Sequence, residues 1–441
     1  MVDRWQKRIG NDALPVDFDN IFNAHQRLAT LPYSAPAVVV KSIVLSSRYD
    51  ADVYFVICTE ATKSFKWRGA GNALLHAAEL GEGKEGVAAS AGNHAQGFVL
   101  AAGELARRGQ LGAFKAISAL TLVIPANTPD AKKEKIYKNS EIELNGQKIR
   151  VVNVIEHGTN FDEARVFAEN YIAQDTLGRM SVPPYDYKYT IAGGGTLAIE
   201  ALAILNQYTP DQSTQFAHTS RMDRRSIIAP DLLYVPSGGG GLVAGMAIVM
   251  DELAPNASVI ACEPAYVQSK YAAMTAGETV KVDPPPSHIG GIRTATGISV
   301  EKMGNIPFEV MNRLGVGTQS VTHDQFSWVT NALNRNEWGN KKGESIKGTG
   351  DIIGGINSES SGSAGVAAFM NMPDADREMA LRKAKLVGRE KPLVMCVITG
   401  ANIDKQDLDK MAEWVKNNPD FPRDNSVARY VAPLRSQAAV R

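Results

Sequence analysis

The chain has 441 residues, of which 44% are hydrophobic and 21% are charged, with 47 Lys and Arg against 47 Asp and Glu. This composition excludes a fibrous or low-complexity protein, and the length favours two or three domains. A net charge of zero provides no basic field for a phosphate backbone, so nucleic acid is not an expected partner.

The three cysteines, Cys58, Cys262 and Cys396, lie far apart, and each is inside an apolar run. Such cysteines are typical of buried thiols in a reducing compartment, and a structural metal site is not expected. The first residues lack the apolar region of a signal peptide, and no apolar stretch is long enough to cross a bilayer. We therefore expect a cytoplasmic protein with no membrane partner.

Apolar runs and helical patterns alternate along the chain. This alternation is typical of an α/β protein with doubly wound, mainly parallel sheets, in which ligands bind at the carboxyl ends of the strands. The chain order is strand 53–58, helix 97–108, strands 120–125 and 149–154, helices 162–174 and 196–207, strand 232–235, helix 242–253, strands 259–262 and 393–398, and helix 406–417.

Three segments interrupt this order and are expected to be surface loops. Residues 208–225 are polar, residues 282–296 include three consecutive prolines, and residues 334–350 are rich in Gly, Lys and Asn.

The sequence LLYVPSGGGGLVAG, residues 232–245, is a predicted strand, four glycines and the start of an apolar helix. Glycines let the backbone approach a ligand closely, and the N–H groups of a helix N-terminus favour an anion. We interpret this turn as a phosphate site. A dinucleotide site and a purely structural turn are the alternatives, although GGGG is not the G-x-G-x-x-G pattern of dinucleotide sites.

Two further runs place small residues before a predicted helix. AGGGTLAIEA, residues 192–201, repeats the order of glycines followed by a helix. GVAASAGNHAQG, residues 86–97, places an amide side chain at a helix start, which suits a carboxylate or another anion. An ordinary capped helix is the alternative for this run.

A lone lysine on a helix is ordinarily a solvated charge, but the lysine of TKSFKWRGA, residues 62–70, is the first of several motifs. It is followed by SAGNHAQG at 90–97, SGGGGL at 237–242, ESSGSAG at 359–365 and ITGAN at 398–402. In these motifs and their order, the chain resembles the threonine dehydratase-like pyridoxal-phosphate enzymes of the tryptophan synthase β-like fold, fold type II, from about residue 52 to residue 402.

The resemblance implies that Lys66 is the catalytic residue and joins pyridoxal 5'-phosphate as a Schiff base. Phe65 would pack on the cofactor ring, Asn93 would hydrogen-bond its phenolic oxygen, and Thr399 would face its pyridine nitrogen. The backbone that would hold the phosphate belongs to Gly238, Gly239, Gly240, Gly241 and Leu242. The turn that would hold the carboxylate of an amino-acid substrate is Ser90, Ala91, Gly92, Asn93 and His94.

The same resemblance implies two doubly wound domains with the cofactor in the cleft between them, and a homo-oligomer, either a dimer or a tetramer. The expected parts are an N-terminal extension (1–49), a large cofactor-binding domain (50–74 and 200–405), a small domain (75–199), and a C-terminal helix and tail (406–441).

The implied reaction is dehydration and deamination of a β-hydroxy amino acid, above all of L-threonine to 2-oxobutanoate and ammonia, with L-serine to pyruvate as an additional reaction. A hydroxyl at Thr399, rather than a carboxylate, makes the ring a weaker electron sink and favours elimination over transamination. Racemisation needs a second base, and Ala91 stands where racemase relatives carry serine. Another β-eliminating lyase, a nicotinamide oxidoreductase and a non-catalytic binding protein are further alternatives.

Three positions depart from the family's pattern. Lys63 stands where relatives often carry glycine or histidine, and Gly194 where they commonly carry glutamine. Relatives with a divalent cation carry an Asp a few residues after a Glu-Pro pair, whereas here Glu263 and Pro264 have no such partner near Ser269, so no cation is expected.

Overall fold

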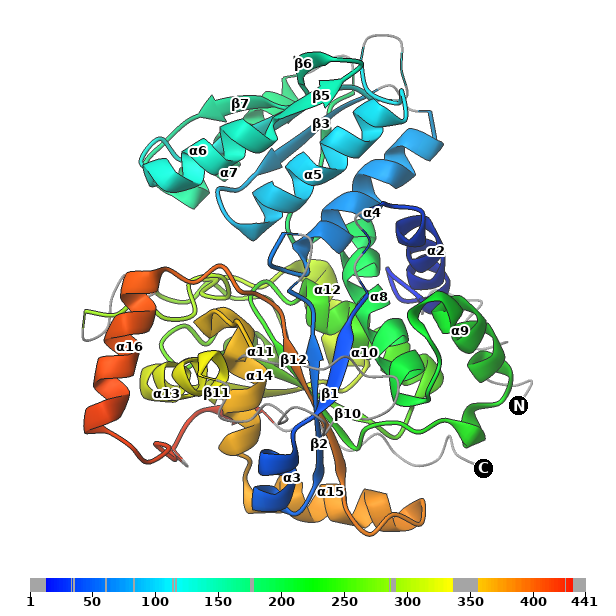
Figure 1. Ribbon diagram of the computed structural model, residues 1–441, viewed down its shortest axis with the longest axis vertical. Helices are drawn as coiled ribbons and strands as arrows, with labels where there is room; N and C mark the ends of the chain where they lie inside the picture. The colour runs from blue at the N-terminus through cyan, green and yellow to red at the C-terminus, as the bar shows by residue number, and fades with distance from the viewer. Residues whose placement is uncertain are drawn as a thin grey trace.

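The computed structural model describes residues 13–430 except 33, 35, 60–61, 82–83, 113–114, 116, 175–177, 285, 287–290, 336–355 and 425. Its helices and strands form two lobes (Figure 1), each built around a sheet of mainly parallel strands. The predicted α/β class with parallel sheets is therefore confirmed. Within the described part of the chain, no helix combines the length and the apolar character needed to span a membrane.

The larger sheet has seven strands, of which the central five are parallel and the two edge strands are antiparallel to their neighbours. Every residue of its central strands β12 and β9 is buried, as their continuous apolar runs predict. In spatial order the strands are β1 (Val38–Lys41), β2 (Asp52–Ile57), β12 (Leu393–Ile398), β9 (Leu232–Pro236), β10 (Ser258–Pro264), β11 (Gly317–Val321) and β13 (Arg429–Tyr430).

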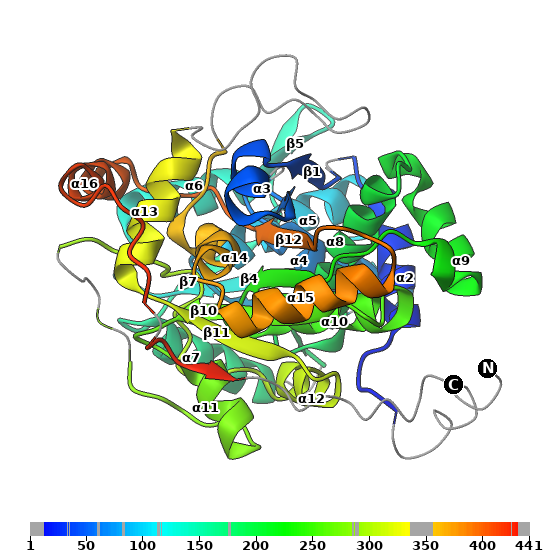
Figure 2. The same cartoon turned by 90° about the horizontal axis from the view of Figure 1, so that it is seen from below.

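Two apolar layers cover this sheet because successive strand residues point to opposite faces. Leu233 and Val235 of β9 pack on one side, and Leu232 and Tyr234 on the other. In Figure 2, α8 and α10 lie to the right of the sheet and α13 and α14 to the left. The first layer contains α2 (Phe18–Ala29), α8 (Lys188–Leu205), α9 (Ser213–Met222), α10 (Gly241–Leu253) and α12 (Asn305–Arg313); the second contains α3 (Ile43–Tyr49), α13 (His323–Asn334), α14 (Ser360–Met370) and α15 (Asp374–Leu386).

The smaller sheet has four parallel strands, with a separate antiparallel pair beside it. Helix α4 (Lys66–Glu79) connects the lobes, since it packs against α5 of the small lobe and α8 of the large one. The small-lobe elements are β7 (Asn153–Glu156), β4 (Ile117–Ile124), β3 (Lys84–Ala89), β8 (Met180–Ser181), the pair β5 (Glu141–Leu144) and β6 (Gln147–Arg150), and helices α5 (Asn93–Arg107), α6 (Asp130–Asn139) and α7 (Phe161–Ala173).

Both ends of the described chain belong to the large lobe. The segment expected to be an N-terminal extension supplies the edge strand β1, and the expected tail supplies the opposite edge strand β13. The predicted helix at residues 406–417 is α16 (Lys405–Asn417), and α11 (Ser269–Ala276) follows β10.

Three predictions about single elements are wrong. Residues 149–154 are not one strand but the end of β6 and the start of β7, which belong to different sheets, with Val151 and Val152 buried between them. Residues 208–225 are not a loop without a helix, because α9 lies there and buries Phe216 and Ala217 in the core. Its remaining residues are mostly polar, so one apolar pair did not reveal the helix.

The third error concerns the glycines of AGGGTLAIEA. These glycines do not precede a helix, because α8 begins at Lys188 and contains Gly193, Gly194 and Gly195 in its buried middle. The proline-rich loop 282–296 carries no helix or strand in its described residues. Most of the predicted loop 334–350 lies outside the described residues.

Candidate active site

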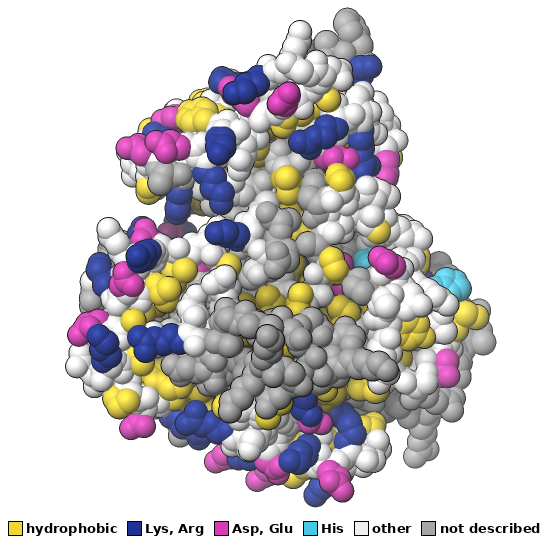
Figure 3. All heavy atoms as spheres, in the orientation of Figure 1, with side chains coloured by type: hydrophobic (Ala, Val, Ile, Leu, Met, Phe, Trp, Pro, Cys, Tyr) yellow, Lys and Arg dark blue, Asp and Glu magenta, His cyan; other side chains and the backbone are white. Residues whose placement is uncertain are grey.

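The predicted site residues lie beyond the carboxyl ends of parallel strands from both sheets. Thr399 directly follows β12, Ser237 follows β9 and Ser90 follows β3, while Lys66 opens the helix after β2. Ligands of doubly wound sheets bind at these strand ends. Figure 3 shows the surface hollowed between the two lobes, with Lys and Arg side chains on both sides of the hollow.

Lys66 is held at the first residue of α4. Its Nζ donates a hydrogen bond to the carbonyl oxygen of Pro184 at 2.8 Å and lies 5.1 Å from the centre of the Phe65 ring. Burial lowers the pKa of Lys66 from 10.5 to about 8. At pH 7 roughly a tenth of the Lys66 amine is therefore neutral, far more than for a free lysine, and the neutral form is the one that acts as a nucleophile or a base.

A buried ion pair fixes the helix that carries this lysine. Arg68, which has no exposed surface, donates to both carboxylate oxygens of Glu200 on α8, at 2.6 and 2.7 Å. On the other side, α5 approaches so closely that a Cβ on Gly97 would lie 2.9 Å from the backbone of Lys66 and Trp67. The start of α4 is thus held from both lobes.

The glycine turn after β9 has the features of an anion site. Gly240 has φ +92°, a conformation that favours glycine, and α10 begins at Gly241 without a side-chain cap, which leaves its first N–H groups available. Ser237 is buried, and its Oγ has no hydrogen-bond partner in the described part of the chain. A buried hydroxyl in this state indicates a ligand or water that supplies the partner.

Two consecutive residues connect the lysine to the glycine turn. Pro184 accepts the hydrogen bond from Lys66, and the ring of Tyr185 lies directly over Gly239, where a Cβ would overlap it. The backbone of Tyr185 also lies against Gly241, 2.8 Å from the position that a Cβ would take. The amine and the candidate phosphate turn are therefore close neighbours.

Asn93 is the first residue of α5, and both ends of its amide are paired. Its Nδ2 donates to Oε1 of Glu359 at 3.0 Å, and its Oδ1 accepts from Nδ2 of Asn402 at 2.7 Å. Burial raises the pKa of Glu359, which directly precedes α14. Glu359 was not among the predicted site residues, although it opens the ESSGSAG motif that could have indicated it.

The turn from Ser90 to His94 leads into α5, whose first N–H groups are also without a side-chain cap. Ser90 Oγ accepts from the backbone N–H of Gly92 at 3.2 Å. His94 Nε2 lies 2.8 Å from the carbonyl oxygen of Val182, and since a carbonyl only accepts, Nε2 carries the proton. Burial lowers the pKa of His94 to about 3, so the ring is neutral at physiological pH.

Thr399 and Phe65 are joined through the backbone. The carbonyl oxygen of Thr399 accepts from the N–H of Phe65 at 3.1 Å, and the residues on either side, Ser64 and Gly400, form an antiparallel bridge. Thr399 is buried, at 5% exposure, whereas Phe65 is half-buried. The structure thus brings the motif containing the lysine and the last motif side by side.

Comparison with known proteins identifies the family. Residues 32–337 match the family described as pyridoxal-phosphate dependent enzyme. The chain belongs to this family. It is 28% identical over 389 residues to the biosynthetic L-threonine dehydratase IlvA of Mycobacterium tuberculosis, a match that covers 87% of this chain and 72% of that protein. It is 28% identical over 313 residues to the catabolic L-threonine dehydratase TdcB of Escherichia coli, with 71% and 79% covered.

Solved structures share the fold at lower identity. Threonine deaminase isoform 2 from Solanum lycopersicum superposes with a TM-score of 0.64 at 24% identity, with 93% of this chain and 92% of that chain covered. Maize serine racemase superposes equally well, with a TM-score of 0.64 at 22% identity and coverage of 92% and 99%. The protein is a threonine dehydratase-like enzyme of fold type II, and its cofactor is pyridoxal 5'-phosphate.

The residues of the site fit this cofactor. An amine with a lowered pKa suits the aldehyde carbon. The uncapped helix start suits the phosphate, as does the hydroxyl of Ser237, which has no partner among the residues that the structure describes. The half-buried ring of Phe65 lies next to the Lys66 amine, with its centre 5.1 Å from Nζ. The buried Thr399 lies next to Phe65, because its carbonyl oxygen accepts from the N–H of Phe65.

Two departures from the family's pattern now have a structural description. Lys63 has φ +56°, a left-handed conformation that favours glycine over other residues. Glu263, in the Glu-Pro pair, accepts the N–H groups of Lys270 and Tyr271 at 2.9 and 2.7 Å, and its carboxylate lies 3.4 Å from Nζ of Lys270, with neither side chain exposed. Among the described residues, no cluster of His, Cys, Asp and Glu is arranged to hold a metal ion.

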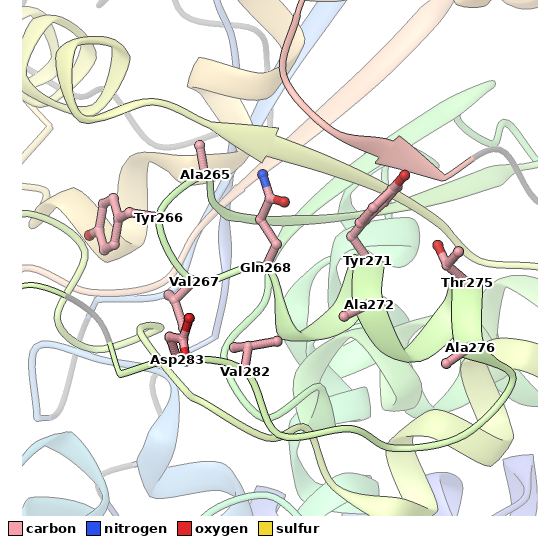
Figure 4. A pocket seen from close by; sticks show the side chains of 10 residues that line it. All are labelled: Ala265, Tyr266, Val267, Gln268, Tyr271, Ala272, Thr275, Ala276, Val282 and Asp283. Atoms are coloured by element: carbon pink, nitrogen blue, oxygen red, sulfur yellow. The ribbon is translucent and has the colours of Figure 1, made fainter.

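A separate hollow of about 510 Å³ lies beside α11 (Figure 4). Its lining includes Tyr271, Thr275 and Gln268, together with Val282 and Asp283. None of the predicted site residues lines this hollow, so we do not assign the reaction to it.

Proposed function

We propose that this enzyme is an ammonia-lyase that dehydrates a β-hydroxy amino acid, with L-threonine giving 2-oxobutanoate and ammonia, and L-serine giving pyruvate. The observation that carries the proposal is the half-buried amine of Lys66, with a pKa of about 8, beside an anion-binding turn. The L-threonine dehydratases of Mycobacterium tuberculosis and Escherichia coli, which match most of the chain, support the choice of substrate.

When bound, pyridoxal phosphate supplies the electron sink that lets an amino acid lose its α-proton. The backbone of residues 238–242 and the hydroxyl of Ser237 would hold its phosphate. Phe65 would pack on its ring, Thr399 would face its pyridine nitrogen, and the amide of Asn93 would face its phenolic oxygen.

Lys66 is the base in this proposal. Its neutral Nζ accepts the α-proton of the substrate, and the carbonyl oxygen of Pro184 at 2.8 Å then accepts a hydrogen bond from the ammonium that results. The α C–H bond and the β C–O bond break, and the α-proton taken by Lys66 is returned to the departing hydroxyl, which leaves as water. Hydrolysis of the C–N bond then gives the 2-oxo acid and ammonia, so the reaction consumes no oxidant or reductant.

The turn of residues 90–94 would orient the substrate. The uncapped N–H groups at the start of α5 favour a carboxylate, as does the positive end of the helix dipole. His94 is neutral, and its Nδ1 has no hydrogen-bond partner among the described residues, so the ring adds no positive charge beside the carboxylate.

Racemisation is the second candidate, because maize serine racemase shares the fold to the same degree as the deaminase. A racemase needs a group on the opposite face of the substrate that exchanges a proton. The methyl group of Ala91 exchanges none, and this favours elimination.

The test supplies L-threonine to the purified enzyme loaded with pyridoxal phosphate, and measures both 2-oxobutanoate and the chirality of the remaining amino acid. Formation of 2-oxobutanoate is expected, with Lys66→Ala lowering kcat by roughly 10³-fold or more. Lys148→Ala, on an exposed position of β6, is the matched control and keeps full activity. D-allo-threonine, the product of inversion at Cα, without keto acid would identify a racemase, and keto acid formation by Lys66→Ala at the wild-type rate would overturn the role of that lysine.

A further inference from the structure

Four segments that are distant in the sequence meet in one chain of hydrogen bonds around Asn93. Nδ2 of Asn402 donates to Oδ1 of Asn93 at 2.7 Å, and Nδ2 of Asn93 donates to Oε1 of Glu359 at 3.0 Å. Nδ2 of Asn402 also lies 3.2 Å from the carbonyl oxygen of Thr62 and 3.4 Å from that of Lys63. The chain of bonds thus runs from the turn before Lys66, through two amides, to a carboxylate.

The direction of these hydrogen bonds is determined at the Asn402 end of the series. The oxygen and nitrogen of an amide are nearly the same size, so hydrogen-bond partners decide which way the group points. The carbonyl oxygens of Thr62 and Lys63 only accept, so Asn402 must turn its nitrogen toward them. The same nitrogen reaches Asn93, which must therefore present its oxygen.

The second end agrees with this direction. With its oxygen turned to Asn402, Asn93 presents Nδ2 to Oε1 of Glu359 at 3.0 Å, and a carboxyl oxygen accepts this bond. Although burial raises the pKa of Glu359, its hydrogen bonds with the Asn93 side chain and the Asn402 backbone act to lower it. The N–H of Glu359 donates to the carbonyl oxygen of Gly400 at 2.8 Å, which holds Glu359 beside the last motif.

We propose that Asn402 and Glu359 are positioning residues that hold the Asn93 amide in one orientation, so that its second N–H points to the phenolic oxygen of the cofactor. Asn93 has two N–H donors, and Glu359 takes one of them. In the opposite orientation, Asn93 would turn an oxygen lone pair toward the phenolic oxygen, and the two acceptors would repel each other. This positioning role rests on the proposed contact of Asn93 with the cofactor, and it holds whichever amino acid is the substrate.

The experiment reverses one bond without changing the shape of the side chain. Asn402→Asp replaces the donating nitrogen with an accepting oxygen. The dissociation constant of pyridoxal phosphate and the pH dependence of its visible absorption are measured by titrating apoprotein with cofactor. We expect the dissociation constant to rise roughly 10- to 100-fold and the pH midpoint of the band to move, because a charge-assisted contact is lost.

A double variant separates orientation from simple loss of a hydrogen bond. In Asn402→Asp with Glu359→Gln, the aspartate accepts from Asn93 and the glutamine donates to it, so both bonds of the Asn93 amide are restored with the reverse direction. We expect this variant to unfold at a temperature closer to the wild-type value than Asn402→Asp alone, while its cofactor binding stays weak. Recovery of wild-type cofactor affinity would overturn the proposal, because only satisfied hydrogen bonds, and not orientation, would then matter.

Two further variants serve as controls. Asn402→Leu removes the donor without adding an acceptor or a charge, and its effect on affinity is expected to lie between the wild type and Asn402→Asp. Asn418→Asp makes the same chemical change where Nδ2 donates to the carbonyl oxygen of Trp414 at the exposed end of α16, and leaves affinity within about 2-fold. Wild-type affinity and an unchanged band in Asn402→Asp would also overturn the proposal, even if the enzyme turned over no threonine.

Discussion

Two glycine runs in this chain look alike in sequence and differ completely in structure. Residues 238–241 form a turn between β9 and the start of α10, whereas residues 193–195 lie inside α8. In the first run, Gly240 has φ +92° and the helix start is left without a cap. In the second run, the backbone is helical throughout.

The interior glycines are needed for contact between helices. A Cβ on Gly193 would lie 2.3 Å from the carbonyl oxygen of Arg68, and one on Gly195 would lie 2.9 Å from that of Gly245. These glycines let α8 approach α4 and α10 at backbone distance. Glycine thus has two physical uses, an unusual backbone conformation and a missing side chain, and a run of letters does not say which applies.

The largest expected effect comes from filling the contact inside α8. Gly193→Ala is expected to lower the free energy of unfolding by about 3 kcal/mol, because the new methyl group meets backbone atoms that cannot move aside. Gly194→Ala is the matched control, since its Cβ would lie 3.7 Å from Leu242 in ordinary contact. It is expected to be neutral or to stabilise by about 0.5–1 kcal/mol. Urea unfolding of both variants measures the difference, and equal stability would contradict the packing role.

Measurements over a range of pH extend the comparison to α4, the helix that begins at Lys66 and that Gly193 contacts. The pKa of Lys66 is lowered from 10.5 to about 8, and only the neutral amine captures an aldehyde. The rate of cofactor capture by apoprotein is expected to rise roughly 10-fold per pH unit below pH 8 and to level off above it. Stopped-flow absorbance measures this rate, and a midpoint near 10.5 would show that burial does not lower the pKa.

The same shift predicts the sign of one contribution to stability. Between pH 8 and 10.5, the unfolded chain binds more protons at Lys66 than the folded apoprotein does. The contribution of this group therefore makes the folded apoprotein more stable as pH rises through that window. This pH dependence should appear in the difference in unfolding free energy between wild type and Lys66→Met, because the variant lacks the titrating group.

Substitution in the glycine turn should have a smaller effect on stability and a specific effect on the cofactor. Gly240→Ala places a side chain at φ +92°, which costs about 1–2 kcal/mol of folding free energy. Gly277→Ala, at φ +78° with no atom within 4 Å of its Cβ, should cost somewhat less, because a Cβ on Gly240 would also lie 2.8 Å from Cβ of Pro307. Only Gly240→Ala is expected to weaken cofactor binding, measured by absorbance titration. Equal cofactor affinities of the two variants would contradict the assignment of the phosphate to this turn.

The smallest expected change in the apoprotein is at Ser237. Its buried Oγ has no partner in the described part of the chain, so Ser237→Ala should leave the stability of the apoprotein within about 0.5 kcal/mol of wild type. Cofactor affinity should fall by roughly 10-fold if the hydroxyl binds the phosphate. Ser327→Ala, a buried serine on α13 with an Oγ in the same state, is the control and should leave affinity unchanged.

Much of the fold could be predicted because the local pattern is strong. The strands at residues 232–235 and 393–398 are continuous apolar runs, and the structure places β9 and β12 there, in the buried middle of the large sheet. Helix α9 was missed because its buried face is narrow, and residues 149–154 were misread because an apolar run does not show where one strand ends and the next begins.

The sequence by itself determined the family, the cofactor and the motif that contains Lys66, because each motif is a short contiguous stretch whose order along the chain can be read directly. Only the tertiary structure decided the lowered pKa of Lys66 and the complete burial of Arg68. It also decided the hydrogen bond between Asn93 and Glu359, which are 266 positions apart. Burial and hydrogen bonding at one atom are set by every segment that packs around it, and those segments become neighbours only when the chain folds.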